Sequence, residues 1–405
     1  MGVAGAGLLA FAGLANTANG GWSFANLHPA GFLASFGQGV QGLQQAGYAR
    51  NSSGSSHAGI WSGSAASFTD LHPAGAVVSF CFGIADGEQA GESILSVGGS
   101  FHAIVWAGSA ESFVDLNPAV ATSSSAWAVS GGKQAGQAVI NGEVHASLWS
   151  GTAASWVDLH PAGAPESIAM GVSGKTQVGI VRVGGSSHAS LWNGTAASWV
   201  DLNPAGAADS FANGISGTQI VGYAFKDGFD RASVWTGTAA SWVDLKPAGA
   251  GDSFGYGAFD GMQVGEARVG GGVGGGVAHA SLWSGTAASW VDLHTFLPAG
   301  YSRSSARAIW SSGGTIFVAG FAHNTATNAD EAALWTSSPA CASDLNGDDL
   351  VDDLDFVVFV AGYNILDCAD EVMPAGCPAD LNADGFVDDA DFVLFVVAYD
   401  ALLCS

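Results

Sequence analysis

The chain repeats one segment about every 43 residues, and this period constrains the fold more than any other feature of the sequence. Each copy contains the Trp that ends a His-Ala-Ser-Leu-Trp-like segment, a Leu-x-Pro segment that we call the corner, or both. The Trp series is Trp61, Trp106, Trp149, Trp192, Trp235, Trp283 and Trp335, and the corner series is Leu27, Leu71, Leu116, Leu159, Leu202, Leu245 and Leu293. The first corner has no His-Ala-Ser-Leu-Trp-like segment before it, and the repeats end with a Trp segment that has no corner after it. A closed ring needs this offset if its first strand completes the last unit.

The copy at residues 164–206 divides into four short runs separated by Gly, Ser and Asn. The runs are residues 167–172, 177–183, 188–192 and 198–202. Short runs punctuated in this way are typical of strands and hairpins. Four strands in each repeat indicate one blade of a propeller.

A third series marks the second strand of each repeat. It is a Gln-x-Gly core that begins at Gln45, Gln89, Gln134, Gln177 and Gln263, while Gly222 and Gly320 fill the same place without the Gln. This series also reaches seven. We therefore predict a mainly β chain in which residues 21–338 form a seven-bladed β-propeller. We expect the strand at residues 24–27 to pair with residues 331–335 and close the ring, which protects sheet edges.

Most of the histidines and many of the carboxylates recur once per repeat. One slot holds His57, His102, His145, His188 and His279, a second holds His28, His72, His160 and His294, and an Asp slot holds Asp70, Asp115, Asp158, Asp201, Asp244 and Asp292. A residue that recurs in every blade is best explained by its role in building the blade, and a catalytic acid and base should instead be unique. We predict that the Asp residues accept turn hydrogen bonds and that the chain has no catalytic residue among these slots.

One departure from the repeat is a candidate ligand site. The connection between successive repeats holds Glu166, Asp209 and Asp252, whereas the corresponding earlier places hold Ala34, Val78 and Ser123. These loops should lie at one end of the propeller axis. An acidic arc there could hold a cation or a hydroxyl-rich ligand such as a carbohydrate, and plain surface acidity is the alternative.

Residues 21–338 resemble the HAF-type extracellular repeats, whose name comes from a His-Ala-Phe motif. Here the motif is His102-Ala-Ile, His145-Ala-Ser, His188-Ala-Ser and His279-Ala-Ser, so the Phe is missing. The resemblance implies a secreted or surface protein and brings no catalytic chemistry with it.

The last part of the chain differs in charge from the rest. Residues 341–405 hold 15 of the 35 acidic residues and none of the 10 Lys and Arg, and the whole chain has a net charge of −25. Nucleic acid is excluded as a partner because phosphate binding needs clustered cations.

Two acidic segments of this tail match the spacing of an EF-hand calcium loop, with Asp in place of the last Glu. Gly385 stands at the sixth position of the second loop, where the first loop has Asp349. We predict two Ca²⁺ ions. The ligands would be Asp344, Asn346, Asp348, Leu350, Asp352 and Asp355 in the first loop, and Asp380, Asn382, Asp384, Phe386, Asp388 and Asp391 in the second.

Each loop is followed by an apolar segment, at residues 356–363 and 392–399, and the duplicated unit resembles a type I dockerin domain over residues 341–405. The resemblance implies a cohesin-like or cell-surface protein as partner. Cellulosomal dockerins often have Ser or Thr at loop positions 10 and 11, where this chain has Asp353-Leu354 and Asp389-Ala390, so a cellulosomal partner is in doubt.

Four of the five cysteines lie in the tail at equal spacing. This spacing predicts one disulfide in each unit, Cys341 to Cys368 and Cys377 to Cys404, and hence an oxidising compartment. Cys81 is expected to be a buried free thiol.

Residues 1–20 are apolar and end in small residues, as in a secretory signal that lacks its basic start, and no other stretch is apolar enough to span a membrane. The sequence thus favours an extracellular, monomeric, non-catalytic binding or attachment protein with an anchoring tail. The alternative is a carbohydrate-active enzyme that hydrolyses polysaccharide and carries a dockerin, and a rigid spacer is a third possibility.

Overall fold

The structure, a computed structural model, describes residues 21–272, 275–337, 343–346, 351–374, 376–382 and 384–401. It divides into two compact units. One is made of Ser23–Ser312 and Ile316–Thr336, and the other contains Ser337–Ser405. The leader predicted at residues 1–20 lies outside the described residues.

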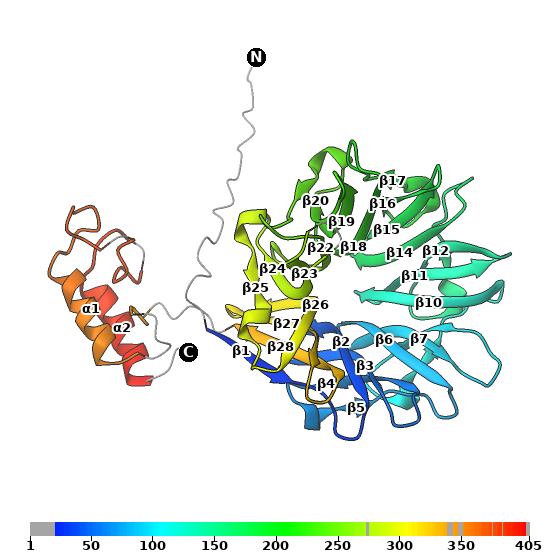
Figure 1. Cartoon of the computed structure of the whole chain (residues 1–405), viewed down its shortest axis with the longest axis horizontal. Helices are drawn as coiled ribbons and strands as arrows, with labels where there is room; N and C mark the ends of the chain where they lie inside the picture. Colours follow the sequence, from blue (N-terminus) through cyan, green and yellow to red (C-terminus); the bar gives the residue numbers. More distant parts are fainter. Residues whose placement is uncertain are drawn as a thin grey trace, which may run out of the picture. The chain divides into compact units, whose positions relative to one another are not determined.

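The first unit contains seven four-stranded antiparallel sheets, each of them one blade (Figure 1). Blade 1 is β2 (Ala34–Gln41), β3 (Gln44–Arg50), β4 (Ser56–Trp61) and β5 (Thr69–Asp70); blade 2 is β6 (Val78–Ala85), β7 (Glu88–Ile94), β8 (His102–Trp106) and β9 (Val114–Asp115). Blade 3 is β10 (Ala121–Ser130), β11 (Lys133–Ile140), β12 (Glu143–Trp149) and β13 (Val157–Asp158); blade 4 is β14 (Ser167–Ser173), β15 (Thr176–Val183), β16 (Ser186–Trp192) and β17 (Val200–Asp201). Blade 5 is β18 (Asp209–Ser216), β19 (Gln219–Lys226), β20 (Phe229–Trp235) and β21 (Val243–Asp244); blade 6 is β22 (Ser253–Phe259), β23 (Met262–Val269), β24 (Val277–Trp283) and β25 (Val291–Asp292). Blade 7 is β26 (Tyr301–Ser312), β27 (Thr315–Asn324), β28 (Ala329–Ser337) and β1 (Trp22–Asn26).

The predicted seven-bladed propeller is confirmed. In blades 1 to 6 the strands follow one another outward from the axis, whereas blade 7 has the order β26-β27-β28-β1, so the first strand of the chain lies outermost beside β28. The inner strands β2, β6, β10, β14, β18, β22 and β26 surround the axis, and β26 lies beside β2 (Figure 1).

The outermost strand of each complete repeat is shorter than predicted. In blade 4 the run expected at residues 198–202 is a 3₁₀ turn, Ala196–Ser198, followed by the two-residue strand β17. Ser198 explains the difference, because its Oγ accepts a 2.8 Å hydrogen bond from the N–H of Asn193 and donates one of 2.6 Å to the carbonyl of Thr195. The equivalent turns are Ala65–Ser67, Ala110–Ser112, Ala153–Ser155, Ala239–Ser241 and Ala287–Ser289, and a further one lies at Leu293–Phe296.

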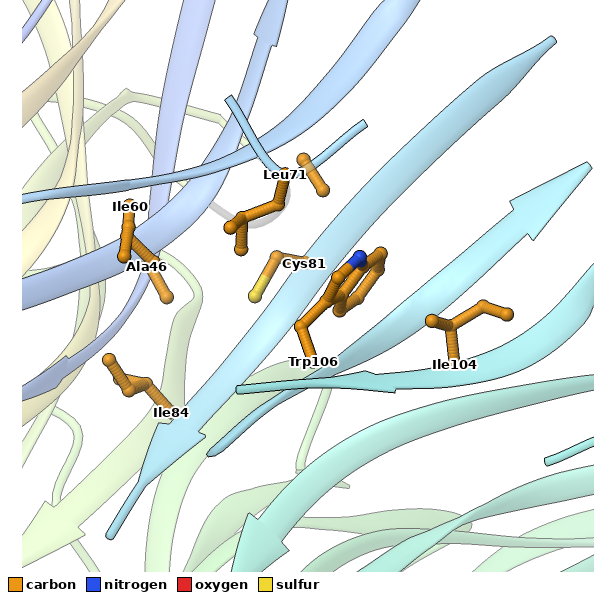
Figure 2. Packing of buried hydrophobic residues seen from close by; sticks show 8 residues of the cluster. Ala46, Ile60, Leu71, Cys81, Ile84, Ile104 and Trp106 are labelled. Atoms are coloured by element: carbon orange, nitrogen blue, oxygen red, sulfur yellow. The ribbon is translucent and has the colours of Figure 1, made fainter. Parts of the chain in front are cut away.

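The seven repeat Trp side chains lie in the cores between blades and are at most 1% exposed. Figure 2 shows one such core, in which Trp106 and Leu71 pack around Cys81. Cys81 is a free, fully buried thiol, as predicted, and burial raises its pKa to about 12. Fully burying a large apolar side chain contributes about 1.5–3 kcal/mol. The repeated Trp therefore stabilises every junction between neighbouring blades.

The second unit contains two helices, α1 (Asp353–Tyr363) and α2 (Asp389–Ala401). Phe359 of α1 and Phe395 of α2 are each 1% exposed and stack with ring centroids 5.0 Å apart. The phenol of Tyr363 donates a hydrogen bond to the carboxylate of Asp389, and the phenol of Tyr399 donates one to the carboxylate of Asp353. The C-terminal part of each helix is thus hydrogen-bonded to the first turn of the other. None of the described helices is long and apolar enough to cross a membrane.

The predicted disulfide pairing is wrong. Cys368 is bonded to Cys377, nine residues later, so neither the Cys341–Cys368 nor the Cys377–Cys404 bond can form. The equal spacing reflects the duplicated sequence of the tail. The fold, however, brings the end of the first copy beside the start of the second copy, and the bond forms there. Cys341 and Cys404 lie outside the described residues.

Candidate functional site

The recurring His and Asp residues form a hydrogen-bonded network at the corner between blades. At the first corner, Asp70 accepts the backbone N–H of His72 (2.8 Å) and lies 2.8 Å from Nδ1 of His57. The rings of His57 and His72 stack with centroids 3.8 Å apart, and Nδ1 of His72 lies 2.9 Å from Oγ of Ser79 in the next blade. The predicted turn bonds recur at Asp115, Asp158, Asp201, Asp244 and Asp292, so the structural role of the Asp slot is confirmed.

A buried Ser near the start of every inner strand was missed in the sequence. Each accepts a backbone N–H from the third strand of the preceding blade at 2.8–2.9 Å; the residues are Ser35, Ser79, Ser124, Ser167, Ser210, Ser253 and Ser304. The signal was present, because a Ser stands at this place in all seven repeats. It was overlooked because an isolated Ser is common in turns and strands alike.

This network has the residue types of a serine hydrolase but not the geometry. A catalytic triad needs one imidazole that bonds both the Ser and the Asp. Here Ser79 bonds the ring of His72, while Asp70 bonds the separate ring of His57. Ser79 is also 0% exposed and accepts the N–H of Ala58, so its hydroxyl is not available to attack a substrate. At this corner the network therefore has a structural role: it joins neighbouring blades.

The predicted acidic arc is only partly assembled. Asp209 accepts the N–H of Ser187 (2.8 Å), and Asp252 accepts that of Asp230 (3.1 Å). Burial together with the charges of Asp252 and Asp209 raises the pKa of Asp230, which places these three carboxyls in one neighbourhood. Glu166 instead lies 3.4 Å from a guanidinium nitrogen of Arg182. Asp209 and Asp252 are thus each fixed to the hairpin of the preceding blade, whereas Glu166 pairs with an Arg of its own blade.

A second set of variable residues lies around the axis. In blades 1 to 6 a β-bulge interrupts the pairing of the inner strand with its neighbour, three residues after the invariant Ser. A bulge re-aims the side chain at the extra residue. We call the residues at this position, together with their blade 7 equivalent, the axial belt: Gln38, Phe82, Trp127, Met170, Asn213, Tyr256 and Arg307. All seven are partly exposed although they lie on the innermost strands.

Small residues flank the belt position and allow the inner strands to approach closely. Gly37 shows the constraint, because a Cβ there would lie 2.8 Å from the carbonyl oxygen of Gly320 in blade 7. The flanking pairs are Gly37 and Gly39, Cys81 and Gly83, Ala126 and Ala128, Ala169 and Gly171, Ala212 and Gly214, Gly255 and Gly257, and Ala306 and Ala308. The scaffold thus fixes the neighbours of each belt residue but leaves the belt residue itself free to vary.

Aromatic rings extend the belt into neighbouring blades. Trp127 stacks on Phe82 with centroids 4.6 Å apart. Further ring contacts run through Phe80, Tyr48, Phe36 and Phe321, and a second group joins Tyr256, Phe254, Tyr223 and Phe211. This arrangement provides flat apolar surfaces on most of the blades around the axis.

Arg307 is the cation of the belt and joins the two aromatic groups. Its guanidinium carbon lies 4.1 Å from the ring centroid of Tyr256 and 5.3 Å from that of Phe321. Burial raises the pKa of Tyr256 to about 12, so its phenol stays protonated at neutral pH and can donate a hydrogen bond. The belt therefore combines aromatic faces with amide, phenol and guanidinium donors.

The two acidic loops of the tail share one pattern of hydrogen bonds. Asp391 is fully buried and accepts the backbone N–H groups of Leu381 (2.8 Å), Asn382 (3.0 Å) and Asp388 (2.9 Å). In the first loop Asp355 accepts the equivalent groups of Leu345, Asn346 and Asp352 at 2.7–2.9 Å. The last Asp of each loop thus closes it, which confirms that the two loops are structural duplicates. Asp348 and Leu350 lie outside the described residues.

The second loop fits calcium by donor chemistry and backbone shape. Gly385 has φ +94°, the left-handed conformation expected at the sixth position. Asp380 accepts N–H groups from Asp384 (3.1 Å) and Gly385 (2.9 Å), so the chain wraps around its first acidic side chain. Among the described residues of this loop, however, three carboxylates do not converge within 4.8 Å of one another. The oxygen donor set suits a hard cation, and ion binding would require these side chains to draw together.

No protein-family model and no curated protein matches the chain. Similar solved structures include an oligogalacturonate lyase from Vibrio parahaemolyticus, at 7% identity over 80% of this chain and 99% of that chain with a TM-score of 0.49. A puromycin-hydrolyzing peptidase from Mycobacterium tuberculosis is 13% identical over 76% of this chain and 54% of that chain, with a TM-score of 0.47. TolB from Acinetobacter baumannii is 12% identical over 65% of this chain and 64% of that chain, with a TM-score of 0.38. This likeness concerns the fold alone.

The prediction of a non-catalytic binding or attachment protein is corrected by these comparisons. Similar structures include the enzymes puromycin hydrolase and prolyl endopeptidase as well as TolB, so the fold does not imply a non-catalytic role. The chain spans about half the length of the peptidases that it matches. The repeat pattern could not decide function, because one propeller scaffold carries many unrelated activities.

Proposed function

We propose that this protein is a ligand-binding propeller whose binding surface is the axial belt, and that the ligand is a carbohydrate. Aromatic faces pack against the C–H faces of sugar rings, while the side chains of Gln38, Asn213 and Arg307 offer donors for sugar hydroxyls. The belt supplies both kinds of contact on the innermost strands.

One observation carries this proposal. The scaffold positions are repeated, with Trp and Ser present in all seven blades, whereas the belt position holds a different residue type in every blade. A position with a scaffold role would keep one kind of side chain, as the neighbouring positions keep a small residue in every blade. Variation at a partly exposed position on a regular frame is what a binding surface requires.

Binding of the full chain to a glycan array, followed by calorimetry with the best glycan, tests this function. Trp127→Ala should weaken binding by about tenfold, because a stacking surface is lost. Phe225→Ala is the matched control, since Phe225 is also aromatic, is 40% exposed and lies outside the belt. Equal effects of the two variants, or no glycan bound at all, would reject the proposal. Cleavage of peptide substrates by the full chain would favour a peptidase-like role instead.

The tail is, in this proposal, a dockerin-like module that binds two Ca²⁺ ions, and the propeller repeats are of the HAF type. The support is the duplicated loop, with buried Asp355 and Asp391 accepting the same three backbone N–H groups in each copy. Ca²⁺ titration of the full chain by calorimetry should give two sites. The double variant Asp380→Asn and Asp384→Asn should remove one of them, and unchanged stoichiometry would reject calcium at the second loop.

Two further proposals concern the closure of the ring and the place where the protein acts. The N-terminal strand β1 closes the ring by completing blade 7, which its position beside β28 supports. The protein acts outside the cell, where the disulfide between Cys368 and Cys377 is stable. Detection of the intact protein in the culture medium tests the second point.

A further inference from the structure

We propose that Glu143, His145 and His160 form a binding site for one transition-metal ion of the zinc type, at the corner between blades 3 and 4. One ligand atom from each residue lies within 4.8 Å of the other two. Glu143 and His145 are two residues apart on β12 and therefore point to the same face of the strand. His160 belongs to the connection from β13 to β14. The site is independent of the axial belt and of the calcium loops.

His145 is already oriented as a metal ligand. Its Nδ1 lies 2.9 Å from Oδ2 of Asp158, and a carboxylate can only accept, so Nδ1 carries the proton. Its Nε2 then has a free lone pair, and this atom is buried without a hydrogen-bond partner. Oε2 of Glu143 lies 3.8 Å from it. A carboxylate that holds the far nitrogen of a metal-binding His is the usual supporting arrangement at zinc sites.

His160 supplies the second imidazole. Its ring stacks on that of His145, with centroids 4.0 Å apart and an angle of 9° between the planes. Nδ1 lies 2.8 Å from Oγ of Ser167, and Nε2 lies 2.8 Å from the carbonyl oxygen of Ala164. Metal binding therefore exchanges one of these hydrogen bonds for a coordinate bond and requires the ring to tilt from the stack. Where Nε2 is the ligand, its proton passes to solvent.

The repeats provide internal comparisons. The same stacked pair recurs as His57 with His72 (3.8 Å) and as His279 with His294 (4.1 Å). At the place of Glu143 these blades have Ser55 and Val277. In blade 1, moreover, Nε2 of His57 is bonded to Asn51 (3.1 Å). Within the described part of the propeller, the three donors come together at blade 3.

The donor set selects the class of metal. Two imidazoles and one carboxylate suit Zn²⁺ and its neighbours, whereas Ca²⁺ and Mg²⁺ prefer oxygen ligands throughout. Three protein ligands leave a fourth tetrahedral position for water. The other three-ligand group among the described residues, Cys368, Cys377 and Asp380, cannot serve in the same way because its cysteines form a disulfide.

The test uses the full chain with saturating Ca²⁺, which occupies the tail loops. Co²⁺ absorbance and Zn²⁺ calorimetry should report one site, and Glu143→Ser should weaken it by about tenfold or more. Glu143 is exposed and bonds no scaffold group, so Glu143→Ser should keep the thermal midpoint of the parent in the presence of EDTA. The reverse change, Val277→Glu, places an acid beside the stacked pair of blade 6 and should add a second, weaker site.

Two results would overturn the proposal. One is wild-type protein that binds no Zn²⁺ below about 1 mM. The other is a Glu143→Ser variant with the same stoichiometry and affinity as the wild type. A site that survives Glu143→Ser but is lost in His57→Asn would place the metal at blade 1 and would also reject the assignment.

Discussion

The backbone N–H of Ala332 donates a 2.8 Å hydrogen bond to Oγ of Ser35 and so joins the last blade of the ring to the first. The same bond links every other pair of neighbouring blades, for example Ala146 to Ser167. The junction between the two ends of the ring is therefore built like the six junctions within the chain.

Removal of the junction hydroxyl should destabilise the propeller equally at either place. Ser167→Ala leaves the N–H of Ala146 buried without a partner, which costs about 1–3 kcal/mol, and Ser35→Ala should cost the same. Urea unfolding followed by tryptophan fluorescence measures both. Ser302→Ala, at an exposed position of β26, should change stability by less than about 0.5 kcal/mol. If Ser167→Ala lowered the free energy of unfolding and Ser35→Ala did not, the junction between blade 7 and blade 1 would not be formed in solution.

The N-terminal segment should contribute to stability through Leu27, the residue that follows β1. This side chain is 0% exposed, packs in a cluster with Trp61 and Leu334, and its N–H donates to the carbonyl of Ala332 (2.8 Å). Leu27→Ala should lower the free energy of unfolding by about 2–5 kcal/mol. Leu33→Ala is the control, since Leu33 is 53% exposed. Indistinguishable denaturation curves for the two variants would argue against closure by the N-terminal strand.

Stability should fall as the pH is lowered below about 6.5. Burial, together with the neighbouring imidazole, lowers the pKa of His72, His160 and His294 below the ordinary value of 6.5. On acidification the unfolded chain binds protons at these residues before the folded chain does. The folded state is then disfavoured, and the loss continues until the folded-state pKa values are reached. Thermal midpoints measured in EDTA between about pH 8 and pH 5 should show this decline.

Asparagine at the same three places should remove much of that pH dependence. Blade 5 shows that Asn fits, because Oδ1 of Asn203 accepts from Ser210 (2.6 Å) and its Nδ2 donates to the carbonyl of Ala207 (3.3 Å). The triple variant His72→Asn, His160→Asn and His294→Asn should therefore keep its fold and unfold with a flatter pH profile. A decline as steep as that of the parent would mean that other groups control acid sensitivity.

The disulfide between Cys368 and Cys377 can be checked directly. Mass spectrometry of unreduced Asp-N peptides should find these two residues linked, and a Cys341–Cys368 peptide would contradict the structure. Closing a loop of nine residues should stabilise the tail by about 2–3 kcal/mol. The double variant Cys368→Ser and Cys377→Ser should thus unfold the tail earlier and leave the propeller transition unchanged.

Periodicity was sufficient for the fold because each repeat carries its own strand and turn signals. The Trp, Gln-x-Gly and Leu-x-Pro series each reached seven without knowledge of any contact. The scaffold role of the Asp slot was equally predictable, because a catalytic carboxylate should be unique and this slot holds six equivalent ones. The short outer strands were mispredicted because Ser198 forms its bonds to a turn that the strand pattern does not reveal.

The sequence by itself determined the ring, its number of blades and the duplicated acidic loops, because these features repeat locally along the chain. Tertiary structure alone decided which residues from different repeats come together. The pairing of Cys368 with Cys377, the incomplete acidic arc, the axial belt and the cluster of Glu143 with two histidines all depend on it. The physical reason is that bulges, stacked rings and bonds across the corners between blades set side-chain directions, and one-dimensional spacing carries no record of those directions.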